Sequence, residues 1–127
     1  MKASELRIGN LVVYNGSVFR VTRISKNIIT ADRGKGDVDF TLKDLQPLKI
    51  TEFWLEKFGF KKDKITNFHY LRICNDWSNI YFDAIHQILD LSISGHSAVL
   101  KQIINVHQLQ NLHHSLSGND FEFDLLK

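Results

Sequence analysis

Both ends of one short helix are specified near the middle of the chain, in the stretch ITEFWLEKFGF. Thr51 stands where an N-cap side chain accepts a backbone N–H, and Ile50 and Leu55 have the spacing of a hydrophobic staple across the first turn. Gly59 follows the last turn, where many helices end in the left-handed conformation that glycine tolerates best. The stretch therefore predicts a helix over residues 52–58, with strand-like sequence on both sides of it.

Residues 1–48 have the pattern of short strands joined by turns. Apolar and polar residues alternate through LVVYNGSVFRVTRI, and Asn15-Gly16 supplies the positive φ angles of a hairpin turn. Further turn residues follow at 25–27 and 33–37. A few short strands within so small a segment are typical of a small curled β-sheet, and we expect an SH3-like barrel.

The rest of the chain, residues 49–127, predicts an α+β subdomain. Segments of alternating polarity separated by polar turns fill residues 60–103 and predict an antiparallel β meander. A second helix is expected over residues 106–116, because Asn105 can cap its start and Gly118 can end it. We therefore predict an α+β fold in which the N-terminal β subdomain and this second part form one compact unit.

Three histidines lie in that second helix, in the stretch INVHQLQNLHHSLSG. At about 100° per residue, the apolar side chains gather on one face, and His107 and His114 fall on the opposite face, which we expect to face solvent. They stand about 10.5 Å apart along the helix, too far to share one metal ion, whereas helical zinc sites use residues four positions apart. Further ligands would have to come from His69, His86 or His96, so we expect no metal and no other cofactor.

Trp54 and Cys74 each allow a functional and a structural interpretation. An exposed Trp54 could stack on a ligand, but an amphipathic helix more often buries its tryptophan, and we expect it in the core. Cys74 is the single cysteine and lies in the apolar run YLRIC, which favours a buried free thiol over a catalytic nucleophile. The sequence contains neither a phosphate-binding P-loop nor a nucleophile elbow, and we expect a protein that is not an enzyme.

The net charge of +2 is unevenly distributed along the chain. Residues 1–50 contain nine Lys or Arg and five Asp or Glu, whereas residues 51–127 contain seven and nine. The basic residues of the first part that could contact phosphates are Arg20, Arg23, Lys26, Arg33 and Lys35. Arg20 and Arg23 fall on opposite faces of a regular strand, so the patch is small and predicts only weak nucleic-acid binding. A protein partner or self-association is the stronger expectation.

Three phrases of the chain resemble a known family, in the same order. They are LRIGN near the start, ITEFWLEKFGF in the middle, and VHQLQNLHHSLSG near the end, followed by an acidic-aromatic tail. The chain is in this way similar to a family of short uncharacterised proteins that are frequent in Bacteroidetes genomes, often near prophage or mobile-element genes. Ile50 stands where the family often has leucine, and His113 and His114 stand where it often has an aromatic pair. The family has no established activity, so the resemblance transfers no functional residues.

The sequence contains no apolar stretch of about 18 residues, the length that a membrane-spanning helix requires, so we expect a cytoplasmic protein without membrane contact. We expect its function to be that of a non-enzymatic binding or accessory module that recognises protein. A weak nucleic-acid-binding module is the first alternative, and a small histidine-dependent metal enzyme is the second.

Overall fold

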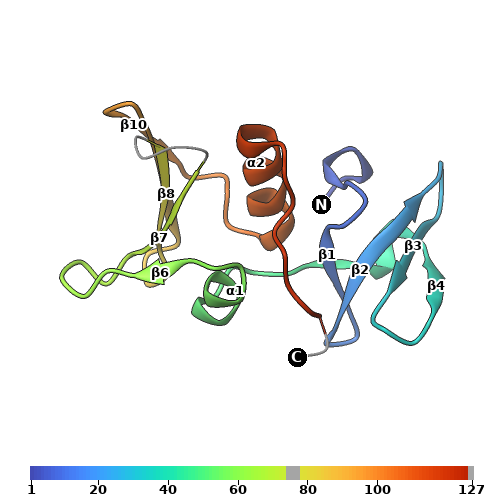
Figure 1. Cartoon of the computed structure of the whole chain (residues 1–127). Coiled ribbons are helices and arrows are strands. Elements are labelled where there is room, and N and C mark those ends of the chain that lie inside the picture. Colours follow the sequence, from blue (N-terminus) through green and yellow to red (C-terminus); the bar gives the residue numbers. More distant parts are fainter. Residues whose placement is uncertain (74–77, 126–127) are drawn as a thin grey trace.

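The computed structural model describes residues 1–73 and 78–125 and has the α+β fold that the sequence predicts (Figure 1). A five-stranded antiparallel sheet stands at each end of the molecule, and the two α-helices lie between the sheets (Figure 1). The first sheet contains β1 (Leu11–Tyr14), β2 (Ser17–Ile24), β3 (Ile29–Asp32), β4 (Asp37–Phe40) and β5 (Gln46–Pro47). The second contains β6 (Lys61–Lys62), β7 (His69–Arg72), β8 (Ser78–Asp83), β9 (Ile88–Ile93) and β10 (His96–Leu100). The helices are α1 (Glu52–Lys57) and α2 (Val106–Ser117), and 3-10 helices span Ala3–Glu5 and Leu42–Asp44.

The first sheet follows the predicted succession of short strands but does not close into a barrel. Its strand order is β4-β3-β2-β1-β5, and within the described residues the edge strands β4 and β5 do not pair with each other. Asn15 and Gly16 join β1 to β2 with φ angles of 52° and 81°, the geometry that an Asn-Gly pair favours. The expected SH3-like barrel is an open sheet because β5 is only two residues long and ends in Pro47, which has no N–H to donate to a further strand.

One face of the first sheet has a small hydrophobic core of its own. Val21 on β2 and Ala31 on β3 are cross-strand partners and are both buried on this face. Phe19 and Phe40 close the core with rings whose centroids are 5.1 Å apart. The other buried members are Leu6, Val12, Ile29 and Leu45.

The opposite face of the first sheet contributes to the larger core of the molecule. Leu11 on β1 is fully buried, and Val18 on β2 is partly buried, against residues of both α-helices and the second sheet. The second sheet supplies three fully buried side chains to this core, Ile80, Phe82 and Leu89. Side chains from residues 1–48 and from residues 49–127 therefore share one core.

The second sheet is the antiparallel meander that the sequence predicts. Its strand order is β10-β9-β8-β7-β6, so each strand pairs with the next one along the chain. A tight turn joins β9 to β10 at Ser94 and Gly95, with φ angles of 50° and 85°. Cys74, expected to be a buried thiol, and residues 75–77 of the expected polar turn lie outside the described residues.

Helix α1 forms where the sequence predicts it, but its start is fixed differently. Ile50 and Leu55 are buried together, as the hydrophobic staple requires. Gly59 has a φ of 94°, and the Phe60 N–H donates to the Leu55 carbonyl at 2.9 Å, which gives the expected left-handed ending. Thr51 has the extended backbone of an N-cap, yet its hydroxyl makes no cap hydrogen bond. The buried staple, rather than the Thr51 side chain, therefore positions the first turn.

Helix α2 also starts and ends as predicted. The Gln108 side chain accepts hydrogen bonds from the N–H groups of Ile104 and Asn105, both at 3.0 Å, and so holds the first turn. At the other end, Gly118 has a φ of 77°, and its N–H donates to the His114 carbonyl at 2.8 Å.

The prediction that His107 faces solvent is wrong. Its side chain is only 1% exposed, because the N-terminal segment covers the polar face of α2 (Figure 1). His107 Nε2 lies 3.4 Å from Oε2 of Glu5 in that segment. His114, by contrast, is partly exposed, and its Nδ1 lies 3.2 Å from Asp120 Oδ1. A hydrophobic periodicity identifies the apolar face of a helix, but a polar face can be buried as well when its side chains find partners.

The side chain of Gln110 bonds α2 to the backbone of the N-terminal segment. It is 6% exposed; the Leu11 N–H donates to its Oε1 at 2.8 Å, and its Nε2 donates to the Gly9 carbonyl at 3.0 Å. β5 pairs with Val12 and Val13 of β1 but not with Leu11. The Gln110 amide thus supplies the hydrogen bonds that a neighbouring strand would otherwise make at that end of β1. Asn111 strengthens the junction by donating from Nδ2 to the Glu5 carbonyl at 2.7 Å.

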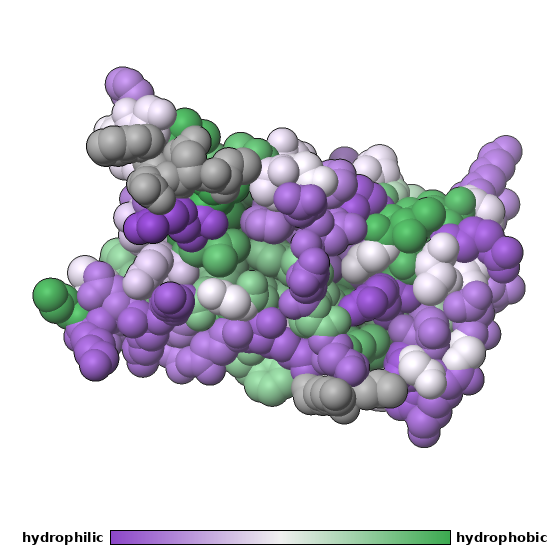
Figure 2. Space-filling model, in the orientation of Figure 1, coloured by the Kyte–Doolittle hydropathy of each residue, from purple (hydrophilic) through white to green (hydrophobic). Residues whose placement is uncertain are grey.

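Large exposed apolar side chains are scattered over different elements. Among the described residues they include Phe53 in α1, Ile65 between β6 and β7, and Ile85 between β8 and β9. On the face seen in Figure 2, hydrophilic side chains divide the hydrophobic surface into separate areas. A site on this molecule is therefore better sought in a local hollow than on a broad apolar face.

Replacing Gly59 with Val should lower the free energy of unfolding by about 1–2 kcal/mol, because a β-branched residue resists the positive φ of this position. Apart from its neighbours in the chain, no described residue has an atom within 4 Å of the place that a Cβ would take, so backbone strain is the expected cause. Gly59→Asn is the control, since asparagine tolerates the left-handed region and should cost less. Chemical denaturation measures both, and equal losses would contradict the strain argument.

Replacing Gln110 with Ala should lower the free energy of unfolding by about 1–3 kcal/mol, because it leaves the buried Leu11 N–H and the Gly9 carbonyl without a partner. The exposed Gln102 offers a matched control, and Gln102→Ala should stay within about 0.5 kcal/mol of the natural chain. Urea unfolding of the two variants gives the comparison. A Gln110→Ala protein as stable as the control would show that the junction contributes little.

Candidate functional site

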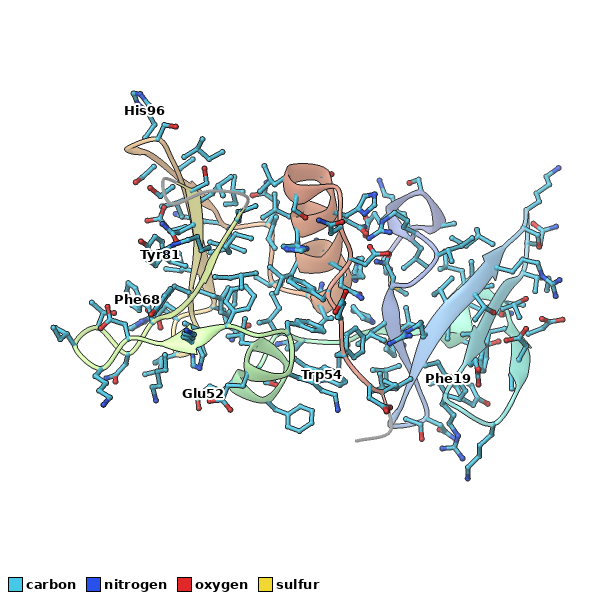
Figure 3. The ribbon with its side chains drawn as sticks, in the orientation of Figure 1. Phe19, Glu52, Trp54, Phe68, Tyr81 and His96 are labelled. Atoms are coloured by element: carbon cyan, nitrogen blue, oxygen red, sulfur yellow. The ribbon has the colours of Figure 1, made fainter. Side chains whose placement is uncertain are left out.

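The histidines do not gather into a metal site. Among the described residues, no three His, Cys, Asp or Glu side chains are placed to hold a metal ion. The histidines that lie beside a carboxylate each meet a single one: His86 Nδ1 lies 2.6 Å from Asp83 Oδ2, and His69 Nε2 lies 3.8 Å from Glu56 Oε1. His96 is exposed at the tip of the second sheet, well away from α2 (Figure 3).

The five basic residues singled out in the sequence are arranged differently from the expectation. A β-bulge at Thr22 interrupts the alternation of β2, so that Arg20 pairs with Asp32 and Arg23 pairs with Thr30. Cross-strand partners share a face, and Asp32 and Thr30 are two residues apart on β3. Arg20 and Arg23 therefore lie on the same face, and the prediction of opposite faces, which assumed a regular strand, is wrong.

Acidic residues on that same face offset the two arginines. Asp37 is the cross-strand partner of Asp32, and Asp39 that of Thr30, so all three carboxylates lie on the face of Arg20. Backbone N–H groups of the β3–β4 loop donate to Asp32 and keep the pKa of its carboxyl below the usual range. This face consequently has no excess of positive charge with which to attract a phosphate backbone.

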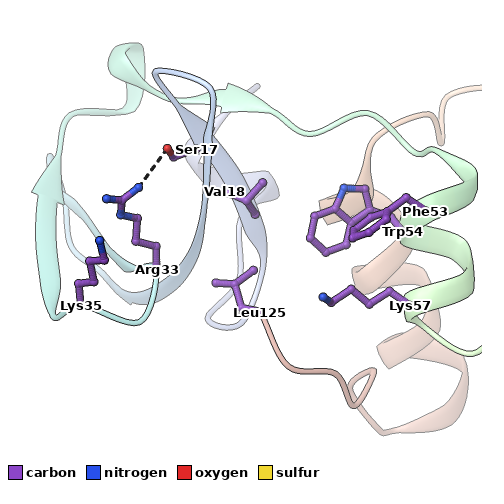
Figure 4. Close-up of a pocket in the computed structure, with 8 residues that line it drawn as sticks. All are labelled: Ser17, Val18, Arg33, Lys35, Phe53, Trp54, Lys57 and Leu125. Carbon is purple, nitrogen blue, oxygen red and sulfur yellow. Dashed lines mark hydrogen bonds between the residues drawn. The ribbon is translucent and has the colours of Figure 1, made fainter. Parts of the chain in front are cut away.

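Arg33 and Lys35, in contrast, meet at an open groove between the first sheet and α1 (Figure 4). The groove holds a cavity of about 430 Å³ lined by Ser17, Val18, Arg33, Lys35, Phe53, Trp54, Lys57 and Leu125. Lys57 extends from α1 toward the first sheet and adds a third cation (Figure 4). No acidic side chain is among the described residues that line this cavity. Lys26, in the β2–β3 turn, is not part of it.

The β3–β4 loop that presents the two basic side chains is held in position. Asp32 Oδ1 accepts hydrogen bonds from the backbone N–H groups of Gly34, at 2.7 Å, and Lys35, at 3.1 Å. Arg33 Nη1 donates to the Ser17 hydroxyl at 3.2 Å, a contact drawn in Figure 4. The positions of both cations therefore follow from the fold of the first sheet.

The wall that faces them is aromatic. Phe53 is 60% exposed, and its ring meets that of Trp54 edge to face, with centroids 5.2 Å apart. Trp54 is the core residue that the sequence predicts, and its ring edge also lines the groove. Lys57 Nζ lies 5.3 Å from the Phe53 centroid and 5.8 Å from that of Trp54. Cations beside aromatic rings suit a ligand that offers both carboxylates and apolar side chains.

Sequence reasoning did not identify Phe53 or Lys57 as site residues. They stand four positions apart on α1, so their side chains share one side of the helix. The available signal was Phe53 itself, a large apolar residue outside the buried stripe of a short amphipathic helix. That Lys57 faces Arg33 and Lys35 depends on how the two parts of the chain pack.

The segment after α2 passes between α1 and the first sheet and belongs to neither sheet (Figure 1). Phe121 stacks on Phe58 with ring centroids 4.4 Å apart, and on His113 at 4.1 Å. The ring centroids of Phe123 and Phe58 are 5.1 Å apart. Leu125 lines the cavity beside α1 (Figure 4).

Acidic residues alternate with these apolar ones along the segment. Asp120 Oδ1 accepts from Arg7 Nη2 at 2.9 Å and lies 3.2 Å from His114 Nδ1. Burial raises the pKa of Asp120, but the two basic partners outweigh that effect and keep its pKa below the usual range. Glu122 and Asp124 are exposed. The segment thus buries its apolar side chains more than its acidic ones, and Asp120 is paired at the surface.

Comparison of the chain with protein-family models, with curated proteins and with solved structures gave no match. Within the described part of the chain, none of the helices has the length and apolar character needed to cross a membrane. The chemistry of the groove and of the segment beside it is therefore the basis on which a function is proposed.

Replacing His107 with Gln should weaken the loss of stability that the protein shows between about pH 7.5 and about pH 5.5. Burial lowers the pKa of His107, and Glu5 opposes this effect without overcoming it. The unfolded chain takes up a proton near the ordinary pKa of about 6.5, while the folded chain still holds a neutral imidazole. The free energy of unfolding is therefore greatest above that pH and decreases as the pH falls below it.

Urea unfolding at the two pH values measures this difference. The exposed His96 provides the control, and His96→Gln should keep the pH dependence of the natural chain. Part of the dependence should persist in His107→Gln, because burial also lowers the pKa of His113. The same pH dependence in both variants would contradict a buried, neutral His107.

Proposed function

We propose that this protein is a non-enzymatic binding module that recognises another protein through the groove between the first sheet and α1. The observation that carries the proposal is the composition of the groove, in which Arg33, Lys35 and Lys57 surround a cavity walled by Phe53 and Trp54. The cations suit carboxylates, and the rings suit apolar or aromatic side chains. The ligand that meets both conditions is an acidic segment of a partner protein that also contains apolar residues.

An extended segment is the form of ligand that this groove favours. Residues 119–124 of the chain itself lead to the groove without forming a helix or a strand, and Leu125 lines it. Arg20 Nη2 donates to the Phe123 carbonyl at 3.5 Å, and its guanidinium lies 4.6 Å from the centroid of the Phe123 ring. This segment supports the proposal because it combines acidic and aromatic residues against the same surfaces.

Nucleic acid has less support as the ligand. Three cations would neutralise at most about three phosphates, and the affinity for duplex DNA falls by about 0.9 log units per phosphate for each tenfold increase in salt. The neighbouring face of the first sheet sets Asp32, Asp37 and Asp39 beside Arg20 and Arg23. We therefore propose that any binding to duplex DNA is weak and is largely lost at physiological salt.

A histidine-dependent metal enzyme has less support again. In the part of the chain that is described, His69, His86, His107 and His114 each lie beside a single carboxylate, and His113 stacks on Phe121. The resemblance to the Bacteroidetes family adds an accessory role, linked to prophage or mobile elements, as a part of the proposal. A cytoplasmic location is also part of the proposal.

Selection from a displayed library of random peptides tests the proposal on the natural chain. We expect enrichment of peptides that combine Asp or Glu with aromatic residues. Arg33→Ala and Lys57→Ala should each weaken the binding of a selected peptide by about tenfold, the effect of losing one charge-assisted contact of about 1.5 kcal/mol. Fluorescence anisotropy with the labelled peptide measures these affinities.

Arg23→Ala and Lys26→Ala are the matched controls, because each removes one positive charge outside the groove. They should change the peptide affinity by less than about twofold, as surface substitutions away from a site usually do. Equal losses in the control variants, or selected peptides without acidic residues, would contradict the proposed site. Submicromolar binding of duplex DNA in about 150 mM salt that Arg33→Ala abolishes would favour nucleic acid instead.

A further inference from the structure

The segment after α2 carries an inference that rests on the proposed function and makes it more specific. We infer that residues 120–125 are a tethered occupant of the groove. The partner supplies an acidic segment with aromatic or apolar side chains at alternate positions, and this segment displaces the tail.

The sequence of the tail, DFEFDL, alternates strictly between acidic and apolar residues. Alternate side chains of an extended chain point to opposite sides, so one side of the tail is apolar and the other is acidic. Burial of the apolar side chains decreases along the tail: Phe121 is buried, whereas Phe123 and Leu125 are only partly buried. The tail is therefore anchored most firmly next to α2 and least firmly where it reaches the groove.

Side chains, rather than a ladder of strand hydrogen bonds, hold the tail. Phe121 is stacked between Phe58 and His113, Arg20 covers the ring of Phe123, and Arg7 pairs with Asp120. Since the tail belongs to neither sheet, its release breaks no strand pairing. Segments held in this way open at a smaller free-energy cost than the core strands and helices.

The groove is wider than the tail that lies in it. One hollow of about 470 Å³ lies between Phe123 and the first sheet, where Arg20 and Asp32 line it. Another, of about 360 Å³, lies between Phe123 and α1, where it is lined by Phe53, Lys57 and the acidic residues Glu56 and Asp124. An incoming segment can thus contact Lys57 and the Phe53 ring while the tail is still bound, and then replace it.

Two sets of positive charges lie along the tail. Arg7 and Arg20 contact the tail, and Arg33, Lys35 and Lys57 line the cavity that Leu125 reaches. An acidic segment with alternate aromatic residues can therefore satisfy both sets of side chains. A short tether keeps the tail near the groove at a millimolar effective concentration, so a free segment must compete against it.

The test uses a fluorescent peptide with the sequence of residues 119–125, Asn-Asp-Phe-Glu-Phe-Asp-Leu, and the full-length chain. The Phe121→Ala, Phe123→Ala double variant, whose tail has lost its aromatic anchors, should bind this peptide at least about tenfold more tightly than the natural chain. A peptide with alanine in place of both phenylalanines should not bind. Fluorescence anisotropy gives the affinities, and far-UV circular dichroism reports whether the double variant is folded.

A second variant does not alter the core. Asp120 is largely exposed, and Asp120→Lys places a lysine beside Arg7, so it should loosen the tail and also tighten peptide binding. Glu122→Lys makes the same change of charge at an exposed residue outside those contacts, and it should change the affinity by less than about twofold. If the double variant does not fold, the comparison of Asp120→Lys with Glu122→Lys is sufficient to test the inference.

Equal affinity of the peptide for the natural chain and for the Asp120→Lys variant would overturn the inference, and so would an absence of binding to every variant. Neither result decides the proposed function, which the library selection tests with peptides unrelated to the tail. Concentration-dependent dimers of the natural chain that Asp120→Lys abolishes would also overturn it, because the tail would then occupy a second copy of this chain.

Discussion

The contact between the Gln110 side chain and the backbone of the N-terminal segment is the interaction on which the rest of the structure depends. It attaches α2 to the Gly9 carbonyl and the Leu11 N–H, so the helix is bonded to the edge of β1 in one register and does not merely pack against its side chains. A buried peptide group left without a partner costs about 1–3 kcal/mol, which penalises any sliding of the helix along the strand. The attachment therefore holds α2 against the first sheet.

The contact of α2 with the N-terminal segment also explains why His107 is buried, although its position in the helix predicts that it faces solvent. Periodicity separates apolar from polar residues, and it placed His107 on a face that would ordinarily meet water. The structure buries the N-terminal part of that face, with His107, because Glu5, Gly9 and Leu11 supply partners for its polar side chains. These partners stand about a hundred residues away in the chain, so a reading of local patterns cannot pair them.

Features set by a few neighbouring residues could be predicted, and features set by packing could not. The Asn15-Gly16 hairpin turn and the left-handed ending at Gly59 follow from local backbone chemistry, and both are present. The bulge at Thr22 was missed because a regular strand was assumed, although the apolar residues Phe19, Val21 and Ile24 are spaced by two and then by three positions. Charge alone pointed to Arg33 and Lys35, whereas the aromatic wall that faces them exists only because the two parts of the chain share a core.

Asp32 and the two cations that follow it line different hollows, and this separation leaves the cavity beside α1 with basic side chains. Asp32 is turned toward the N–H groups of its own loop, whereas Arg33 and Lys35 extend into the groove. A surface of cations and exposed rings attracts acidic segments of many kinds, and charge by itself gives little selectivity. On the function proposed for the groove, the tail raises that selectivity, because a partner must satisfy the rings as well as the cations before it can replace a tethered competitor. The alternation of acidic and apolar residues that lets the tail lie in the groove is then the pattern that a partner must match.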